Sequence, residues 1–272
     1  MTEKGKHIIL NNNSRTSCYG SILILSLVLL FHFSGLSGQV ITNTGAAITV
    51  TSGAAVVTKD LTNTSGVYTA RFLNHGTVNM SGNFSNSSGS LTSGDGTFRL
   101  GGNWINPGTF SYGLSTVIFN GSVEQLITKP SPETFYNLSV ENSGAASGFT
   151  LRLNNIVQVI GNLYMKLGNV TSSGFKLYLV NQAAASLNYT SATGSRVLGP
   201  FERGVGQTGD YLFPMGTASY YNPAHLITNA TPVTGSVLTE FLTAPPPGNA
   251  GLPLADVSAV PGVEVDSAYT AG

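Results

Sequence analysis

Apolar and polar residues alternate over short runs along most of the chain after residue 40. Alternation places every second side chain on one face of an extended backbone, and Gly, Asn or Ser bounds each run. The runs are AITV (47–50), TVNM (77–80), TFRL (97–100), STVIFN (115–120), NLSV (137–140), FTLRL (149–153) and KLYLV (176–180). No segment of helical length shows the i, i+3, i+4, i+7 apolar spacing of an amphipathic helix. The pattern predicts an all-β protein of short strands.

A Gly-Asn-apolar motif recurs after three strand-like runs. It begins at Gly82-Asn83, Gly102-Asn103 and Gly161-Asn162, and the third copy follows the second after close to three times the first interval. The first interval, about 20 residues, is typical of one coil of a β-solenoid. Gly permits a sharp corner, and Asn can hydrogen-bond to the coils above and below. We therefore expect a right-handed parallel β-helix with these residues at its corners. A sandwich or barrel is the alternative, because Gly-Asn is also a common turn dipeptide.

The amino-acid composition of the sequence changes near residue 200. Aromatic residues and prolines become more frequent in YLFP (211–214) and YYNP (220–223), and a proline run follows at 245–247. A run of prolines is typical of a stiff linker or an edge loop. The sequence predicts a solenoid domain over 39–199 and a smaller, incomplete C-terminal β-rich module over 200–272.

The N-terminus resembles an export signal. The apolar run SILILSLVLLFHF (21–33) follows Lys4, Lys6 and Arg15 and precedes the small residues SGLSG. This order is typical of a secretory signal peptide, here 1–38, with cleavage after Gly38. An uncleaved anchor is the alternative, but the run is short for a membrane span of ~20 residues. We expect a secreted or cell-surface protein with no transmembrane segment after cleavage. Removal of Cys18, the only cysteine, leaves backbone pairing and packing to hold the fold.

Charged residues are scarce. They make up 9% of the chain, against roughly 25% in an average globular protein. Without residues 1–38, nine basic and eleven acidic residues remain. Phosphate binding needs concentrated Lys and Arg. Nucleic acid is therefore not an expected partner.

Candidate catalytic residues are also dispersed. Only His75 and His225 follow the predicted signal peptide, and no nucleophile, zincin or phosphate-loop motif is present. Glu133 and Glu141 flank a predicted strand without a spacing that demands an acid/base pair. The sequence predicts no enzyme activity, no metal and no cofactor. A carbohydrate-active β-helix enzyme, or its glycan-binding accessory domain, is the alternative.

Aromatic side chains offer a second kind of site. Trp104, Tyr112 and Tyr136 are candidates for stacking on glycans if they lie on the surface. Packing inside the coils is the competing interpretation. Extracellular glycans or surface proteins are the partners that this hypothesis implies.

The segment 119–144 resembles a recurring phrase of large secreted proteins of Bacteroidota-type bacteria. The phrase reads F-x-G-x-x-x-Q-x-I, then T-F-Y-N-L-x-V and N-S-G. It corresponds here to Phe119, Gly121, Gln125, Ile127, Thr134 to Leu138, Val140 and Asn142 to Gly144. The segments 157–163, 199–203 and 211–216 extend the resemblance. Such proteins are modular, adhesin-like β-solenoid proteins of the type IX secretion class. The resemblance implies a rigid structural or adhesive module and carries no catalytic motif. We do not expect the C-terminal sorting domain of that class within residues 1–272, an absence that either truncation or a different route of release would explain.

Overall fold

The computed structural model describes residues 7–10, 38–144, 150–172, 174–231 and 234–241. Within them the regular secondary structure is β-strand, apart from two short 3-10 helices, η2 (Ala184–Ser186) and η3 (Ser191–Thr193). The chain divides into two compact units, 1–241 and 242–272, and every described residue belongs to the first. The predicted all-β class is therefore confirmed. The apolar run 21–33 and the end of the predicted C-terminal module, 242–272, lie outside the described residues.

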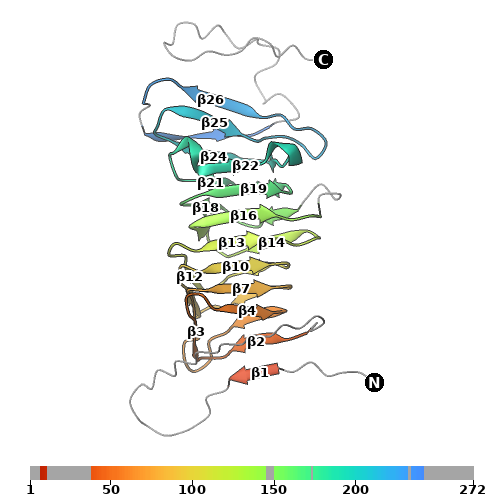
Figure 1. The fold of residues 1–272 in the computed structure, drawn as a ribbon, viewed down its shortest axis with the longest axis vertical. Helices are drawn as coiled ribbons and strands as arrows, with labels where there is room; N and C mark the ends of the chain where they lie inside the picture. The colour runs from red at the N-terminus through yellow and green to blue at the C-terminus, as the bar shows by residue number, and fades with distance from the viewer. Residues whose placement is uncertain (1–6, 11–37, 145–149, 173, 232–233, 242–272) are drawn as a thin grey trace. The chain divides into compact units, whose positions relative to one another are not determined.

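Two parallel sheets, A and C, follow the stack of coils (Figure 1). Sheet A consists, in this order, of β1 (His7–Leu10), β2 (Val40–Asn43), β5 (Asp60–Asn63), β8 (Phe84–Asn86), β11 (Trp104–Ile105), β14 (Gln125–Thr128), β17 (Leu151–Leu153), β20 (Val170–Thr171) and β23 (Val197–Leu198). Sheet C consists of β4 (Ala55–Thr58), β7 (Thr77–Met80), β10 (Thr97–Leu100), β13 (Thr116–Phe119), β16 (Asn137–Glu141), β19 (Leu163–Leu167) and β22 (Leu187–Tyr189). Each full coil contributes one strand to each sheet, so the described residues form a parallel β-solenoid with seven strands in sheet C.

The third face of the coils consists of two successive sheets. Sheet B contains β3 (Ala47–Val50), β6 (Arg71–Asn74), β9 (Leu91–Ser93) and β12 (Thr109–Ser111). Sheet D contains β15 (Glu133–Phe135), β18 (Val157–Val159), β21 (Leu177–Leu179), β24 (Phe201–Val205) and β27 (Gly235–Thr239). The third strand of each of the first four coils therefore belongs to sheet B, and that of each later coil belongs to sheet D. The change falls between β12 and β15.

The register explains the core. In β10, Phe98 and Leu100 are fully buried, while Thr97 and Arg99 alternate with them on the outer side. Phe98 lies opposite Val78 in one neighbouring coil and Val117 in the other. Parallel in-register pairing therefore stacks apolar side chains in continuous inner rows. At ~25 cal/mol per Å² of apolar surface removed from water, such rows supply much of the folding free energy.

The coil length is not constant. Paired residues are 20 apart from Val40 to Asp60 and from Phe84 to Trp104. The separation is 26 from Gln125 to Leu151. The predicted period of about 20 therefore holds for some coils only, since the separation is 23 from Leu61 to Phe84 and falls to 19 from Leu151 to Val170.

The described part of 200–241 is continuous with the solenoid. β24 pairs in parallel with β21, so sheet D extends beyond Pro200, and β27 then pairs antiparallel with β24. The hairpin of β25 (Gly209–Phe213) and β26 (Ala224–Thr228) forms a separate two-stranded sheet. Tyr211 and Phe213 of this hairpin belong to the same buried core cluster as the coils. No membrane-crossing helix, judged by length and apolar character, occurs in the part of the chain that the structure describes.

Candidate functional site

The Gly-Asn residues at 82–83 and 102–103 lie at equivalent corners, between sheet C and sheet A. Asn83 donates its backbone N–H to Asp60 Oδ1 at 2.7 Å. Asn103 donates its own to Asn83 Oδ1 at 2.7 Å, and Leu126 N–H donates to Asn103 Oδ1 at 2.9 Å. Each side-chain oxygen therefore accepts from the same backbone position one coil further along. These bonds join four successive coils.

Glycine precedes each Asn because the oxygen of the neighbouring coil occupies the space of a side chain. A Cβ atom on Gly82 would lie 2.2 Å from Asp60 Oδ1, and one on Gly102 would lie 2.5 Å from Asn83 Oδ1. Both distances are far below van der Waals contact. Gly and Asn thus act as a pair, in which glycine makes room for the bridge that the polar side chain of the previous coil forms.

Gly161 and Asn162 lie at a different corner, between β18 of sheet D and β19 of sheet C. The local chemistry is the same, because Asn162 N–H donates to Asn137 Oδ1 at 2.9 Å and a Cβ on Gly161 would lie 2.7 Å from that oxygen. The assignment of this copy to the same repeat series was wrong. The two coils after residue 104 are 23 and 26 residues long, so a multiple of the 20-residue interval does not return to the same corner.

The aromatic candidates are not one exposed stripe. Trp104 is fully buried, and its ring stacks on Phe84 with centroids 4.0 Å apart. Its assignment as a glycan-stacking residue was therefore wrong. Tyr112 and Tyr136 are partly buried and lie on successive coils, after β12 and after β15. Tyr112 packs against the core cluster.

A row of asparagines forms a buried amide ladder at the corner that follows sheet A. Asn43 Nδ2 donates to Asn63 Oδ1 at 2.9 Å, and Asn63 Nδ2 donates to Asn86 Oδ1 at 2.9 Å. Asn86 Nδ2 in turn donates to Asn106 Oδ1 at 2.8 Å. All four side chains are 0% exposed. The amide dipoles point the same way, with their N–H groups toward the C-terminal coils.

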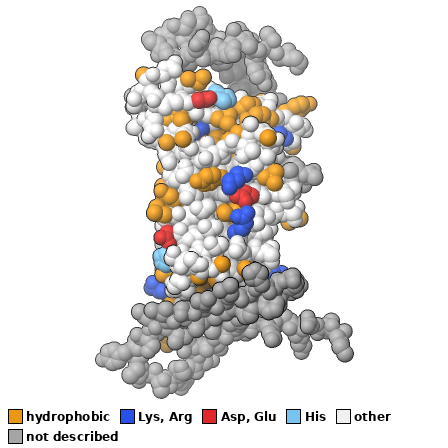
Figure 2. Space-filling model, viewed as in Figure 1, with side chains coloured by type: hydrophobic (Ala, Val, Ile, Leu, Met, Phe, Trp, Pro, Cys, Tyr) orange, Lys and Arg blue, Asp and Glu red, His pale blue; other side chains and the backbone are white. Residues whose placement is uncertain are grey.

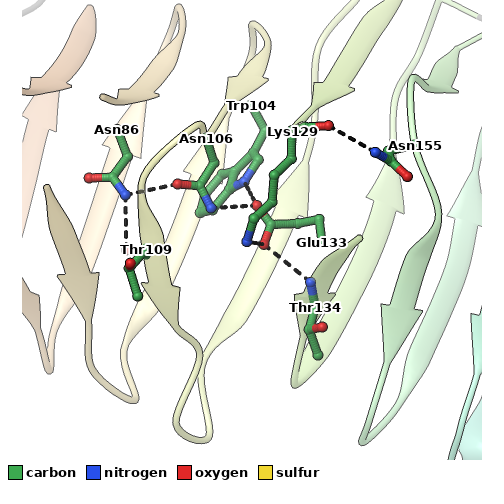
Figure 3. Close-up of polar contacts among 8 residues, drawn as sticks. All are labelled: Asn86, Trp104, Asn106, Thr109, Lys129, Glu133, Thr134 and Asn155. Carbon is green, nitrogen blue, oxygen red and sulfur yellow. Dashed lines mark hydrogen bonds and ion pairs between the residues drawn. The ribbon is translucent and has the colours of Figure 1, made fainter. Parts of the chain in front are cut away.

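The ladder ends on Glu133 (Figure 3), where Asn106 Nδ2 donates to Glu133 Oε2 at 2.6 Å. Trp104 Nε1 donates to the same oxygen at 2.8 Å. Lys129 Nζ and the N–H of Thr134 donate to Oε1 at 3.0 and 3.1 Å. A carboxylate has about four acceptor positions, and four donors occupy them here. A negative charge at the end of aligned amide N–H groups is favourable for the same reason as at a helix N-terminus.

Sequence reasoning missed this ladder. A signal was present, since Gly follows each of the four asparagines at the second or third position, as in Asn43 to Gly45 and Asn86 to Gly89. The asparagines themselves recur at steps of 20, 23 and 20 residues. The Gly-Asn dipeptide, which is more conspicuous in the sequence, lies at the opposite end of the sheet A strands.

Gln125, which belongs to the Bacteroidota-like phrase, also joins coils. Its Nε2 donates to Leu100 O at 3.0 Å in the preceding coil. Its Oε1 accepts from the Gly121 N–H at 2.9 Å and from Asn142 Nδ2 at 2.8 Å. The residues that carry the resemblance at this corner therefore have a structural task.

Comparisons with known proteins add no relative. No family model matches the chain, and neither a curated protein nor a solved structure gives a significant match. The function of the chain is therefore inferred from its own residues.

The other charged groups lie mainly on the surface, where they are sparse (Figure 2). Glu141 forms ion pairs with Arg99 at 2.7 Å and Lys166 at 2.9 Å. Burial raises its pKa, but hydrogen bonds from Lys166 and Ser139 and the two positive charges outweigh burial and lower the pKa below its ordinary value. Glu133 and Glu141 thus have separate hydrogen-bond partners.

The two histidines lie in separate pairs. His75 Nδ1 is 2.5 Å from Asp95 Oδ1, and His225 Nδ1 is 2.8 Å from Asp210 Oδ1. The hydrogen bond with His75 lowers the pKa of Asp95. Within the described ranges, no group of three His, Cys, Asp or Glu side chains is placed to hold a metal ion. By contrast, the buried polar side chains of the Asn ladder, Glu133 and Gln125 form hydrogen bonds between neighbouring coils.

Proposed function

We propose that the chain is a non-catalytic structural and adhesive module, a rigid β-solenoid spacer at the cell surface or in the secreted fraction. The carrying observation is the ladder Asn43–Asn63–Asn86–Asn106–Glu133, whose members are all at most 1% exposed. A buried polar group costs roughly 1–3 kcal/mol when it is left without a partner. Each rung therefore fixes the position of the next coil, which favours one rigid stack.

The use of the polar side chains supports a mechanical role. The oxygens of Asp60, Asn83 and Asn103 accept from the next coil, and those of Glu133 accept from four donors. General acid/base catalysis needs a group that can reach a substrate proton. Satisfied inter-coil bonds serve rigidity instead.

Export is the second part of the proposal. The apolar run 21–33 after basic residues supports a signal peptide, and the phrase at 119–144 supports the type IX secretion class. The module would then present surfaces to extracellular glycans or to other surface proteins. Weak contacts repeated along many copies give useful avidity without a deep pocket.

The test expresses the full chain in a bacterial host with its own N-terminus. Mass spectrometry of the exported fraction is expected to find Gln39 as the first residue. The exported protein is then incubated with a panel of soluble polysaccharides, and reducing ends are counted. We expect no turnover. Turnover that disappears on replacing Glu141 or Glu202 by Gln would contradict the proposal and favour a carbohydrate-active β-helix enzyme. A glycan array run in parallel separates an accessory binding module from a bare spacer.

A further inference from the structure

The corner between sheets A and B contains one enlarged loop. In the first, third and fourth coils the chain turns from sheet A to sheet B within 44–46, 87–90 and 106–108. In the second coil it uses 64–70. Insertions in repeat proteins map to loops on one face, which is often the binding face. We call 64–70 the corner loop.

Hydrogen bonds hold the corner loop on the next coil. Ser65 Oγ donates to Gly89 O at 2.8 Å and lies 3.0 Å from Ser90 Oγ. Ser65 Oγ also accepts from the Ala70 N–H at 3.0 Å. Within the loop, Gly66 N–H donates to Tyr68 O at 3.2 Å. The loop therefore presents its tip in a defined position, and ordering it on a ligand costs little entropy.

The tip is apolar and exposed. Val67 is 94% exposed and Tyr68 is 67% exposed. Arg71, the first residue of β6, follows the loop and is also exposed. Its neighbours in register are Ala47 and Leu91, and its side chain forms no ion pair with any residue in the described ranges. Its positive charge is thus available to an external partner.

We propose that the corner loop and Arg71 form a contact site for carboxylate-bearing polysaccharides. The Tyr68 ring supplies a flat face for the apolar side of a sugar ring, Val67 widens that face, and Arg71 pairs with a uronate carboxylate. This inference rests on the proposed adhesive function and names the class of ligand. A specific protein partner needs roughly 800 Å² on each side, which two side chains at a loop tip do not supply. A flexible polysaccharide can bind many copies through such small contacts.

The experiment uses immobilised polygalacturonate and, as a matched neutral polymer, its methyl ester. Binding of the exported full chain is measured by biolayer interferometry at low and high salt. We expect binding to polygalacturonate, loss of most of it at high salt, and weak binding to the ester. Tyr68→Ala is expected to weaken binding about tenfold, in the range of a truncated aromatic anchor. Arg71→Gln is expected to abolish the preference for the acid over the ester.

Tyr220→Ala is the control, because Tyr220 is 69% exposed and lies outside the solenoid coils, between β25 and β26. It should bind like the unmodified chain, and circular dichroism should show all three variants folded. Equal binding to acid and ester, or equal weakening by Tyr68→Ala and Tyr220→Ala, would overturn the site. Binding by a protein on a surface array, with none to polygalacturonate, would overturn the ligand class. Release of reducing ends from polygalacturonate would instead count against the proposed non-catalytic function.

Discussion

The coils before and after Glu133 solve the same stacking problem in two ways. Before it, asparagines fill the buried corner and aromatic rings fill the interior; Trp104 alone contacts Phe84, Phe110 and Phe135, with centroids 4.0, 4.9 and 5.4 Å away. After it, the fully buried residues of β18 and β21 are aliphatic, namely Val157, Val159, Leu177 and Leu179, and an aromatic ring returns to sheet D only with Phe201 of β24. Ion pairs such as Lys176–Glu202 join the later coils on the outside.

The difference coincides with a change in how strongly the coil length varies. An amide ladder needs each Asn directly above the last, and the sequence separation of paired positions in sheet A alternates between 20 and 23 residues as far as Ile127. Beyond that residue the separation varies more widely, because Gln125 pairs with Leu151, Leu151 with Val170 and Val170 with Val197, which are 26, 19 and 27 residues apart. The ladder passes the enlarged corner loop 64–70 unbroken, because the insertion follows Asn63 and leaves the register of the sheet A strands unchanged. Apolar packing tolerates variation in coil length better than a directional hydrogen bond, because the hydrophobic effect is non-directional.

The largest expected effect is in the aromatic interior. Trp104→Ala removes the ring contacts and one donor to Glu133, so we expect the free energy of unfolding to fall by about 4 kcal/mol. Its neighbour Ile105 is 36% exposed, and Ile105→Ala serves as control with a loss below about 1 kcal/mol. Urea denaturation followed by circular dichroism measures both. Similar small losses would show that the early coils do not depend on this ring.

The second-largest loss of stability is expected from breaking the asparagine ladder in its middle. Asn86→Ala leaves Asn63 Nδ2 and Asn106 Oδ1 each without one partner, and we expect a loss of about 3 kcal/mol. Asn154 bridges coils at the surface, through Thr128 Oγ1 at 3.1 Å. Asn154→Ala should therefore cost below about 0.5 kcal/mol. The same denaturation assay compares them, and equal losses would remove the distinction between buried and exposed bridges.

Substitution of a corner glycine is expected to cause a smaller loss of stability. Gly102→Ala places a Cβ 2.5 Å from Asn83 Oδ1, so we expect a loss of about 2 kcal/mol from overpacking. Gly66 has open space around the position that a Cβ would take, and it has no positive φ. Gly66→Ala should leave the melting temperature unchanged or slightly raised, because it restricts the unfolded chain. A neutral Gly102→Ala in calorimetry would refute the steric role of the Gly-Asn pair.

Two carboxylates on the outer surface of the later coils predict a small dependence of folding stability on pH. Burial raises the pKa of Glu202, but hydrogen bonds from Lys176 and Ser236 and the Lys176 charge outweigh burial and lower the pKa below its ordinary value. The pKa of Glu141 shifts in the same direction. A lowered pKa in the folded state stabilises the fold above the unfolded pKa, and this contribution is lost as the pH falls through the folded value.

Glu141→Gln with Glu202→Gln should therefore flatten the fall in stability from pH 6 to the acid side of about 4, by about 1 kcal/mol or less. Urea midpoints at several pH values measure it. If stability falls equally steeply with pH in the double variant, other carboxylates, such as Asp95, determine the loss of stability at acid pH.

The class of fold could be predicted from the sequence because alternation and recurrence depend on local chemistry. TVNM and TFRL read as strands, and they pair in register as β7 and β10. The position of Gly161-Asn162 could not be predicted, because it depends on the lengths of insertions between strands. Nor did the sequence separate Trp104 from Tyr68, since the burial of an aromatic side chain depends on which face of the coil it occupies. Glu133 became intelligible only when the fold placed it beside Asn106.

The central claim is the in-register stack, and the distance between its ends tests it most directly. Val40 and Leu198 lie in the same outer row of sheet A, at β2 and β23. Spin labels on cysteines at these two positions, with Cys18 replaced by Ser, are measured by pulsed electron resonance. Seven steps of about 4.8 Å predict a narrow distribution centred at roughly 34 Å. A broad distribution, or a separation below about 20 Å, would contradict the stack.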